Sequence, residues 1–334
     1  MLIARIPLRV SLLGGGSDMP EYYESGQIGE VIGFAIKKYI TIYANLPLLI
    51  DKSTVKYSKT ETFDSPSDIE HPTFREALRI YWDNSKKIEL ASFADIRSGT
   101  GLGSSSIFTV ALIGLLKKLN NQSFTPYSLT KDSFNIERNI LKEPVGLQDG
   151  AYGAYGGCCH FKFYSGDNLD HSTINLYQQD IEMIKESFFL VFTNQSRSAH
   201  KILKNLTYSL NNDSQKKNYQ TQIVRFVEEG KKSLQNGDYK TLGNLILESY
   251  ELKKKLNNYE YKVDQSSDIN KIEVLLKNDS IYGYKLLGAG GGGFFLVIGK
   301  IKECKEYLNS LGLNPIPIEI DNKGCNISPT NTSE

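Results

Sequence analysis

GTGLGSSS, residues 99–106, combines three glycines with three serines, and a mostly apolar run follows at residues 107–116. A glycine-rich backbone lets a phosphate group approach closely, and the free N–H groups of a helix that starts there favour an anion. The serine hydroxyls can cap that helix or reach a metal ion and phosphate oxygens. The stretch therefore predicts a phosphate-binding loop with a helix directly behind it.

Two further glycine-rich segments lie near the ends of the chain, LLGGGSD at residues 12–18 and GAGGGG at residues 288–293. No Gly-Lys-Ser/Thr motif follows the loop at 99–106, which excludes a Walker P-loop. GAGGGG matches a dinucleotide fingerprint in its letters, but a strand pattern follows it where that fingerprint needs a helix. Its glycines exceed the need of a turn, so they favour close backbone packing against another loop.

The composition is that of a globular protein, with 334 residues, 40% hydrophobic and 23% charged. A net charge of +1 argues against a dedicated nucleic-acid-binding protein. No run of 18 apolar residues occurs, and Arg5 and Arg9 interrupt the N-terminal apolar stretch, which indicates a strand rather than a signal peptide. The four cysteines and four histidines lack metal-binding spacing, so we expect reduced thiols, a cytoplasmic location and no transition metal.

The order of elements predicts an α+β protein with two lobes. Strand patterns occur at 2–13, 30–46, 158–164, 187–193, 281–287, 293–299 and 316–321. Helical patterns occur at 71–84, from the end of the 99–106 loop to about Leu119, at 127–142, within 198–277 and at 301–311. AYGAYGG at 151–157 is expected to form a turn, and a polar tail from Asp321 to be disordered. Lys253, Lys254 and Lys255 follow Glu248 and Glu251, a pattern typical of a solvated helix face.

Phosphoryl transfer to a hydroxyl needs a carboxylate at the hydroxyl, a cation at the phosphoryl group and a metal ion on the nucleotide phosphates. Asp149 lies among small residues that leave room for a substrate, Glu137 lies on the preceding predicted helix, and Arg9 lies near the end of the first strand. A single Asp in a turn is also typical of a cap, and a single Glu on a helix of a solvated side chain. The residues alone therefore leave these roles open.

Taken together, the three segments resemble the motifs of the GHMP kinases, the superfamily of galactokinase, homoserine kinase and mevalonate kinase. PLRVSLLGGGSD resembles the first motif, GTGLGSSS the second, and KLLGAGGGGFFLVI the third. The resemblance implies an N-terminal lobe similar to domain 2 of ribosomal protein S5 at residues 1–185. It also implies a ferredoxin-like C-terminal lobe at 186–322, followed by a polar tail at 323–334.

The resemblance also implies a site. ATP and Mg²⁺ are the expected cofactors, with a small sugar or sugar phosphate as the other substrate, no nucleic-acid or membrane partner, and a monomer or homodimer. Asp149 and Arg9 are the implied catalytic residues, and Ser105 and Glu137 the implied metal ligands. The implied ATP-binding residues are Gly99, Gly101, Leu102, Gly103, Ser104, Ser105 and Ser106; the acceptor-binding ones are Gly15, Gly16, Ser17 and Asp18; and Gly290, Gly291 and Gly292 would support the phosphate loop.

Within the superfamily, the chain resembles the bacterial D-glycero-D-manno-heptose 7-phosphate kinases in GGGSD, GSSS, LQDGAYGAYGG and FTNQSRSAHKIL. That implies transfer to the anomeric hydroxyl of the heptose 7-phosphate, a step toward GDP-heptose for capsule or other surface glycans. Arg197 and Lys201, four residues apart, and Arg138 are candidates to hold the 7-phosphate. Arg97 departs from the family, which has a small residue or proline there.

Other functions stay open at this point. The acceptor could instead be fucose, galactose or an unphosphorylated heptose, or the chain could be an inactive nucleotide or sugar sensor. The joint presence of Arg9, Ser105, Glu137 and Asp149 opposes the sensor, and three separate glycine loops oppose a purely interacting protein.

Overall fold

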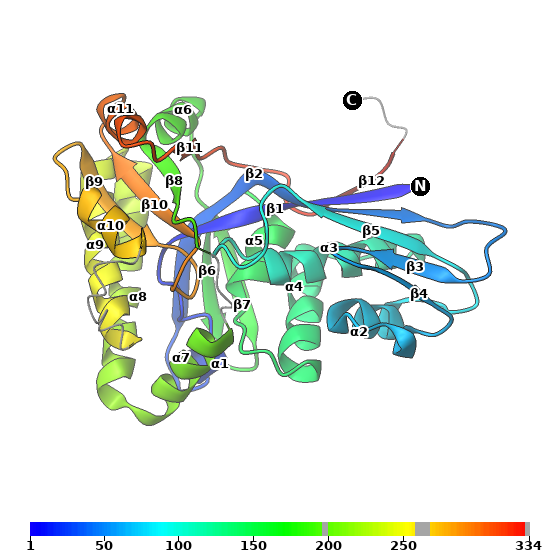
Figure 1. The fold of residues 1–334 in the computed structure, drawn as a ribbon. Helices are drawn as coiled ribbons and strands as arrows, with labels where there is room; N and C mark the ends of the chain where they lie inside the picture. The colour runs from blue at the N-terminus through cyan, green and yellow to red at the C-terminus, as the bar shows by residue number, and fades with distance from the viewer. Residues whose placement is uncertain (196–199, 258–267, 331–334) are drawn as a thin grey trace.

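The computed structural model describes residues 1–195, 200–257 and 268–330, whose strands form two sheets (Figure 1). The strands are β1 (Leu2–Leu13), β2 (Gly29–Asn45), β3 (Ser53–Lys56), β4 (Thr60–Phe63), β5 (Glu89–Ala94), β6 (Cys158–Tyr164), β7 (Asn168–Thr173), β8 (Phe188–Phe192), β9 (Ile281–Leu286), β10 (Phe294–Gly299), β11 (Ile316–Pro317) and β12 (Asn326–Pro329). The larger sheet has the order β12-β1-β2-β5-β3-β4, and the smaller one β11-β8-β10-β9. The long strand β2 pairs with β5 through its C-terminal half and with β6 through its N-terminal half, and β7 extends β6.

Helices pack against both sheets (Figure 1). They are α1 (Pro20–Tyr23), the 3₁₀ segment η1 (Pro66–Asp68), α2 (Pro72–Tyr81), α3 (Ser104–Leu119), α4 (Pro126–Phe134), the π-helical segment η2 (Asn135–Ile140), α5 (Gln148–Tyr155), α6 (Gln178–Ser187), α7 (His200–Asn212), α8 (Ser214–Gln235), α9 (Tyr239–Leu256), α10 (Asp268–Leu275) and α11 (Glu303–Ser310). Helices α3 and α5 pack on β1 and β2, whereas α9 packs on β9 and α8 joins it to β1 and β2. Within the described residues, no helix has the length and apolar character needed to cross a membrane.

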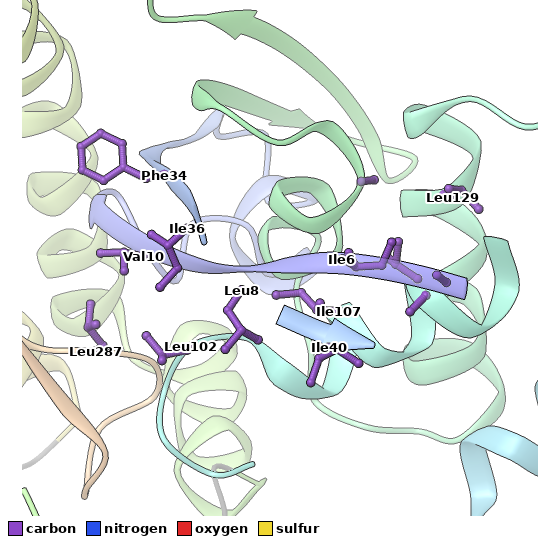
Figure 2. Packing of buried hydrophobic residues seen from close by; sticks show 14 of the residues in the cluster. Ile6, Leu8, Val10, Phe34, Ile36, Ile40, Leu102, Ile107, Leu129 and Leu287 are labelled. Atoms are coloured by element: carbon purple, nitrogen blue, oxygen red, sulfur yellow. The ribbon is translucent and has the colours of Figure 1, made fainter. Parts of the chain in front are cut away.

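Strand β1 runs through the middle of the main hydrophobic core (Figure 2). Its side chains Ile6, Leu8 and Val10 are buried, since alternate residues of a strand share one face. Leu102 and Leu287, which belong to the second and third glycine-rich segments, are buried in the same cluster. Burying a leucine side chain stabilises the folded state by about 2 kcal/mol. The contacts of Leu102 and Leu287 with β1 therefore hold the second and third glycine-rich segments close to the C-terminal end of this strand.

The predicted α+β architecture is confirmed, and the structure corrects several elements. The expected turn at 151–157 is wrong, because residues up to Tyr155 form α5. The expected disorder from Asp321 is also wrong, because β12 pairs antiparallel with β1. Strands β3, β4, β5 and β7 and helix α6 had no prediction; most of these strands are short, polar or at a sheet edge, where apolar alternation is weak.

Candidate active site

A cavity of about 680 Å³, here called the central cavity, is lined by residues from both halves of the chain. The N-terminal half supplies Arg9, Gly15, Gly16 and Asp18, the loop from Ser98 to Ser106, Glu137 and Asp149. The C-terminal half supplies apolar residues of α7 and α8, with Gln220, Lys253, Lys285 and Gly288. All three glycine-rich segments therefore meet at one site, as their resemblance to the three motifs implies.

The loop before α3 has the geometry of an anion-binding segment. Gly103 precedes the helix with φ +78°, and Gly101 has φ +83°, conformations that favour glycine. Ser104, Ser105 and Ser106 form the first turn of α3 and line the cavity. The first N–H groups of a helix have no acceptor within it, so this turn offers donors and a partial positive charge to the cavity.

The third segment packs directly against that loop. A Cβ on Gly288 would lie 2.5 Å from Cα of Gly101, and a Cβ on Gly293 would lie 2.2 Å from the carbonyl oxygen of Thr100. The expected close packing of GAGGGG against another loop is thereby confirmed. The described contacts to the loop come from Gly288 and Gly293 at the two ends of the segment, whereas Gly292 lies against Gln195.

Arg9 and Asp149 form a two-point ion pair at the centre of the site. Nε and Nη2 of Arg9 donate to the two carboxylate oxygens of Asp149 at 2.8 and 2.9 Å. Nη1 of Arg9 donates to the carbonyl oxygen of Gly101. Arg9 is only 3% exposed, and Asp149 lies in the first turn of α5. The pair fixes the carboxylate beside Gly103, where the phosphate loop ends.

Glu137 is a buried carboxyl group on the other side of that loop. It lies in η2, and π-helical turns often occur at functional sites. Ser105 Oγ donates to its Oε1 at 3.2 Å. Burial raises the pKa of Glu137 to about 7, the charge of Asp149 adds to this, and the hydroxyls of Ser105 and Ser106 oppose it. A buried carboxylate beside a serine hydroxyl has the chemistry of a magnesium ligand pair.

The first motif contributes a second buried carboxyl group, Asp18. Its oxygens accept hydrogen bonds from the backbone N–H of Gly16 at 3.0 Å and from the backbone and side chain of Gln148 at 3.2 and 2.9 Å. Burial, together with the charge of Asp149, raises the pKa of Asp18 to about 6. Asp18 thus ties the first motif to the start of α5 and also faces the cavity.

The structure does not bring every predicted residue to the cavity. Ser17 is fully buried, and its hydroxyl both donates to and accepts from the backbone of Glu30. The Arg138 guanidinium pairs with Glu21 of α1, and neither Ser17 nor Arg138 is among the described lining residues. Arg197 lies outside the described residues, as does the side chain of Lys201 at the start of α7.

Sequence reasoning missed several polar residues of the cavity, among them Ser11, Gln148, Gln220 and Lys253. Ser11 Oγ, Gln148 Oε1 and Gln220 Oε1 are buried there and have no hydrogen-bond partner in the described part of the chain. Lys253 lines the cavity as well, so the expected solvated face is wrong for this lysine. Nothing in the sequence of α8 or α9 marks Gln220 or Lys253 as a cavity residue. Gln148, in contrast, is adjacent to Asp149, and adjacency to a candidate carboxylate could have pointed to it.

Comparisons with known proteins agree with this geometry. Residues 73–157 match the family described as GHMP kinases N terminal domain. The chain is 24% identical over 315 residues to the D-glycero-alpha-D-manno-heptose 7-phosphate kinase of Campylobacter jejuni, covering 90% of this chain and 89% of that one. It is also 24% identical to the bifunctional fucokinase/GDP-fucose pyrophosphorylase of Arabidopsis thaliana, covering 91% of this chain and 30% of the plant protein.

The fold has close counterparts among solved structures. A D-glycero-D-manno-heptose 1-phosphate kinase from Bacteroides thetaiotaomicron superposes with a TM-score of 0.77 at 18% identity, over 99% of this chain and 100% of that one. At this identity the superposition establishes the shared fold, and the acceptor is a separate question.

Proposed function

We propose that the chain is an ATP-dependent sugar kinase, because residues 73–157 match the family described as GHMP kinases N terminal domain and the whole chain shares the fold of a solved heptose kinase. The proposed acceptor is D-glycero-D-manno-heptose 7-phosphate, phosphorylated at its anomeric C1 hydroxyl to give the 1,7-bisphosphate. The quoted motifs and the name of the Campylobacter jejuni relative support this acceptor. The proposed setting is cytoplasmic synthesis of GDP-heptose.

The observation that carries this proposal is the Arg9–Asp149 ion pair beside the N-terminus of α3. A phosphoryl group bound at the loop from Gly99 to Ser106 would lie next to a carboxylate that is held in place by two hydrogen bonds. Positioning and electrostatic stabilisation supply most of the catalysis in phosphoryl transfer. The arrangement is therefore suited to transfer of that group to a hydroxyl.

Each predicted residue has a proposed role in this reaction. Asp149 accepts the proton of the acceptor hydroxyl or orients it, and Arg9 holds Asp149 in place. Ser105 and Glu137 would hold Mg²⁺, which neutralises nucleotide phosphate charge when bound. The pairing of their oxygens at 3.2 Å, between the exposed Ser105 and the buried Glu137, fits that ion.

The acceptor is proposed to bind at the end of the cavity formed by the first motif, α5, α7 and α8. Gly15 and Gly16 line the cavity there, as do Ser11, Gln148 and Gln220, each of which has a buried oxygen without a partner in the described part of the chain. Hydroxyl groups of a sugar would satisfy these atoms, since a buried polar atom without a partner costs free energy. We keep Arg197 and Lys201 as the proposed ligands of the 7-phosphate, because α7 borders this end.

The same polar atoms favour a second candidate, a kinase for an unphosphorylated sugar such as fucose, galactose or a free heptose. Arg138, one of three cations proposed for the 7-phosphate, is paired with Glu21 and does not line the described cavity. A sugar without a phosphate would need only the uncharged partners that the cavity provides. The relative from Arabidopsis thaliana, a named fucokinase, is in keeping with this alternative.

A coupled assay of ADP release distinguishes the two candidates. The full chain is supplied with Mg-ATP and, separately, with D-glycero-D-manno-heptose 7-phosphate, mannose 6-phosphate, fucose, galactose or mannose. Turnover with the heptose phosphate well above the others is expected. Preference for an unphosphorylated sugar would replace the heptose phosphate by the second candidate. Binding of ATP without turnover on any sugar would contradict the kinase proposal.

We also propose the division into lobes at 1–185 and 186–322 with a tail at 323–334, and a monomer or homodimer. The strands β1 to β7 fall in the first range and β8 to β11 in the second, which supports this division.

A further inference from the structure

Lys253 of α9, in the C-terminal half of the chain, lies close to the segment that packs against the phosphate loop. Its Nζ donates to the carbonyl oxygen of Gly288, the first glycine of GAGGGG. Gly288 in turn packs on Gly101, since a Cβ added to Gly288 would lie 2.5 Å from Cα of Gly101. The Lys253 ammonium is thereby placed where the phosphate loop and the third segment meet, and it lines the central cavity.

The charges around Lys253 are those of the candidate reaction centre. Burial and, to a smaller extent, the positive charge of Arg9 lower the pKa of Lys253 to about 8, while Asp18 and Asp149 act in the opposite direction. Lys253 keeps some solvent contact through the cavity although protein atoms surround its ammonium. An anionic group between Lys253 and Arg9 would relieve the repulsion between the two cations.

A third cation lies close by and strengthens this preference for an anion. Lys285 of β9 is 7% exposed, lines the cavity and donates from Nζ to the carbonyl oxygen of Leu12 at 3.0 Å. Burial, with the charges of Lys253 and Arg9, lowers the pKa of Lys285 well below its ordinary value. The cluster of three cations is expected to hold a negative charge larger than that of Asp149 alone.

Arg9 and Lys253 differ in how many of their hydrogen-bond donors already have an acceptor in the protein. Arg9 donates through Nε, Nη1 and Nη2, twice to Asp149 and once to Gly101. The Lys253 ammonium has three donors, and Gly288 is its one acceptor among the described residues. Arg9 is thus suited to positioning Asp149, and Lys253 to meeting a group that arrives with the substrates.

We propose that Lys253 contacts the transferred phosphoryl group and stabilises the charge that it carries during transfer, an inference that rests on the proposed kinase function. In this step the acceptor oxygen bonds to phosphorus, the bond from phosphorus to the leaving oxygen of ADP breaks, and the acceptor proton goes to Asp149. Lys253 neither gains nor loses a proton. Its ammonium donates to the equatorial phosphoryl oxygens, over which the charge is spread during transfer.

Nucleotide binding provides the first test, because it needs no acceptor. Calorimetry would compare ADP with a non-hydrolysable triphosphate, adenylyl imidodiphosphate, each with Mg²⁺. Lys253→Met is expected to lower the affinity for the triphosphate about 10-fold and the affinity for ADP less than about 2-fold, since only the triphosphate carries the terminal phosphoryl group. Lys255→Met is the matched control, because Lys255 lies two residues further along α9 and is exposed. An equal loss for both nucleotides would overturn the proposal and assign Lys253 to support of the Gly288 loop.

Turnover provides the second test, with whichever sugar the ADP-release assay selects. Lys253→Met is expected to lower kcat about 10²–10³-fold with little change in the KM for the sugar, as expected for loss of one donor to developing charge. Lys253→Arg should recover part of kcat. A higher KM for the sugar with kcat unchanged would make Lys253 an acceptor ligand and overturn the proposal.

Failure of the proposed function would be recognised separately. A wild-type chain that binds the triphosphate but phosphorylates no sugar would refute the sugar kinase, and the binding comparison would still decide the role of Lys253. A wild-type chain that binds neither nucleotide would overturn both.

Discussion

Asp149 is the carboxylate that Arg9 holds through two hydrogen bonds at the candidate reaction centre. Asp149→Asn keeps the shape of the side chain but removes its charge and basicity, so kcat is expected to fall about 10²–10⁴-fold while ADP binds as before. Steady-state kinetics and calorimetry check this. Asp170→Asn, an exposed carboxylate on β7, is the matched control. Unchanged kcat would remove Asp149 from the mechanism.

Glu137, the proposed metal ligand, illustrates the free-energy cost of a buried carboxyl group in the metal-free chain. Its pKa in the folded chain is about 7, against an ordinary 4.5, so its ionisation opposes folding. The stability that its neutral form provides is complete below pH 4.5 and is lost as pH rises through 7.

Glu137→Gln is therefore expected to stabilise the metal-free chain at pH 8 by about 1–3 kcal/mol and to leave its stability unchanged near pH 4.5. Denaturant unfolding in EDTA at both values measures the difference. Adding Mg²⁺ with nucleotide should stabilise the wild type and not the variant. A wild type that is the more stable at pH 8 without metal would contradict the burial argument.

At the scale of elements, the two glycine-rich loops act as one unit because their backbones touch. Gly293 has φ +100°, and an added Cβ would lie 2.2 Å from the carbonyl oxygen of Thr100. Gly293→Ala should therefore displace the phosphate loop, weaken ADP binding about 10-fold or more, and lower stability.

Gly312 offers a control for the backbone strain alone. It has φ +71°, and nothing lies within 4 Å of an added Cβ. Gly312→Ala should lower stability by about 1 kcal/mol and leave ADP affinity unchanged. Equal effects of the two substitutions on ADP affinity would show that the contact with Thr100 does not hold the loop.

The elements also show which features the sequence could predict. A helix behind the glycine-rich loop is found as expected, because a glycine followed by serines and an apolar run is a strong start signal, but α3 already begins at Ser104, inside the predicted loop. Helix α5 was expected to be a turn because AYGAYGG is rich in glycine. Gly153 instead lets α5 approach α3, since a Cβ there would lie 3.0 Å from Ile107 Cγ1. Glycine used for close packing and glycine used for turns look alike in a single sequence.

The sequence predicts the candidate-site residues that lie in local motifs. It does not predict the residues that α8 and α9 add to the site. Arg9, Ser105 and Asp149 lie in or next to glycine-rich segments, and these three do meet in the central cavity. Gln220 and Lys253 lie in amphipathic helices whose charges look solvated, and only tertiary packing turns these two side chains toward the cavity. Long-range placement of this kind leaves no spacing signal.

At the scale of the whole molecule, the two sheets are linked because the C-terminal segment, after leaving the smaller sheet, pairs with the first strand of the larger sheet. After β11 the backbone of Asp321 bonds to Ala35 and Gly157, and β12 then pairs with the outer edge of β1 (Figure 1). The strand that anchors both glycine-rich loops therefore has partners on both sides. β12 lines no part of the central cavity, so its contribution should be to stability rather than to ligand binding.

Ile327 of β12 allows that division of roles to be tested. Its Cδ1 lies 2.9 Å from the position of a Cβ on Gly114 of α3, and it packs on the main core, whereas the neighbouring Asn326 is exposed. Ile327→Asp would place a charge against this core and should lower Tm by about 3–5 °C, whereas Asn326→Asp on the opposite face should not. Thermal unfolding and calorimetry with ADP measure both effects. Because β1 remains paired with β2 along its length, ADP affinity should stay within about 2-fold of wild type. A large loss of ADP affinity in Ile327→Asp would mean that the outer edge of β1 controls the geometry of the phosphate loop.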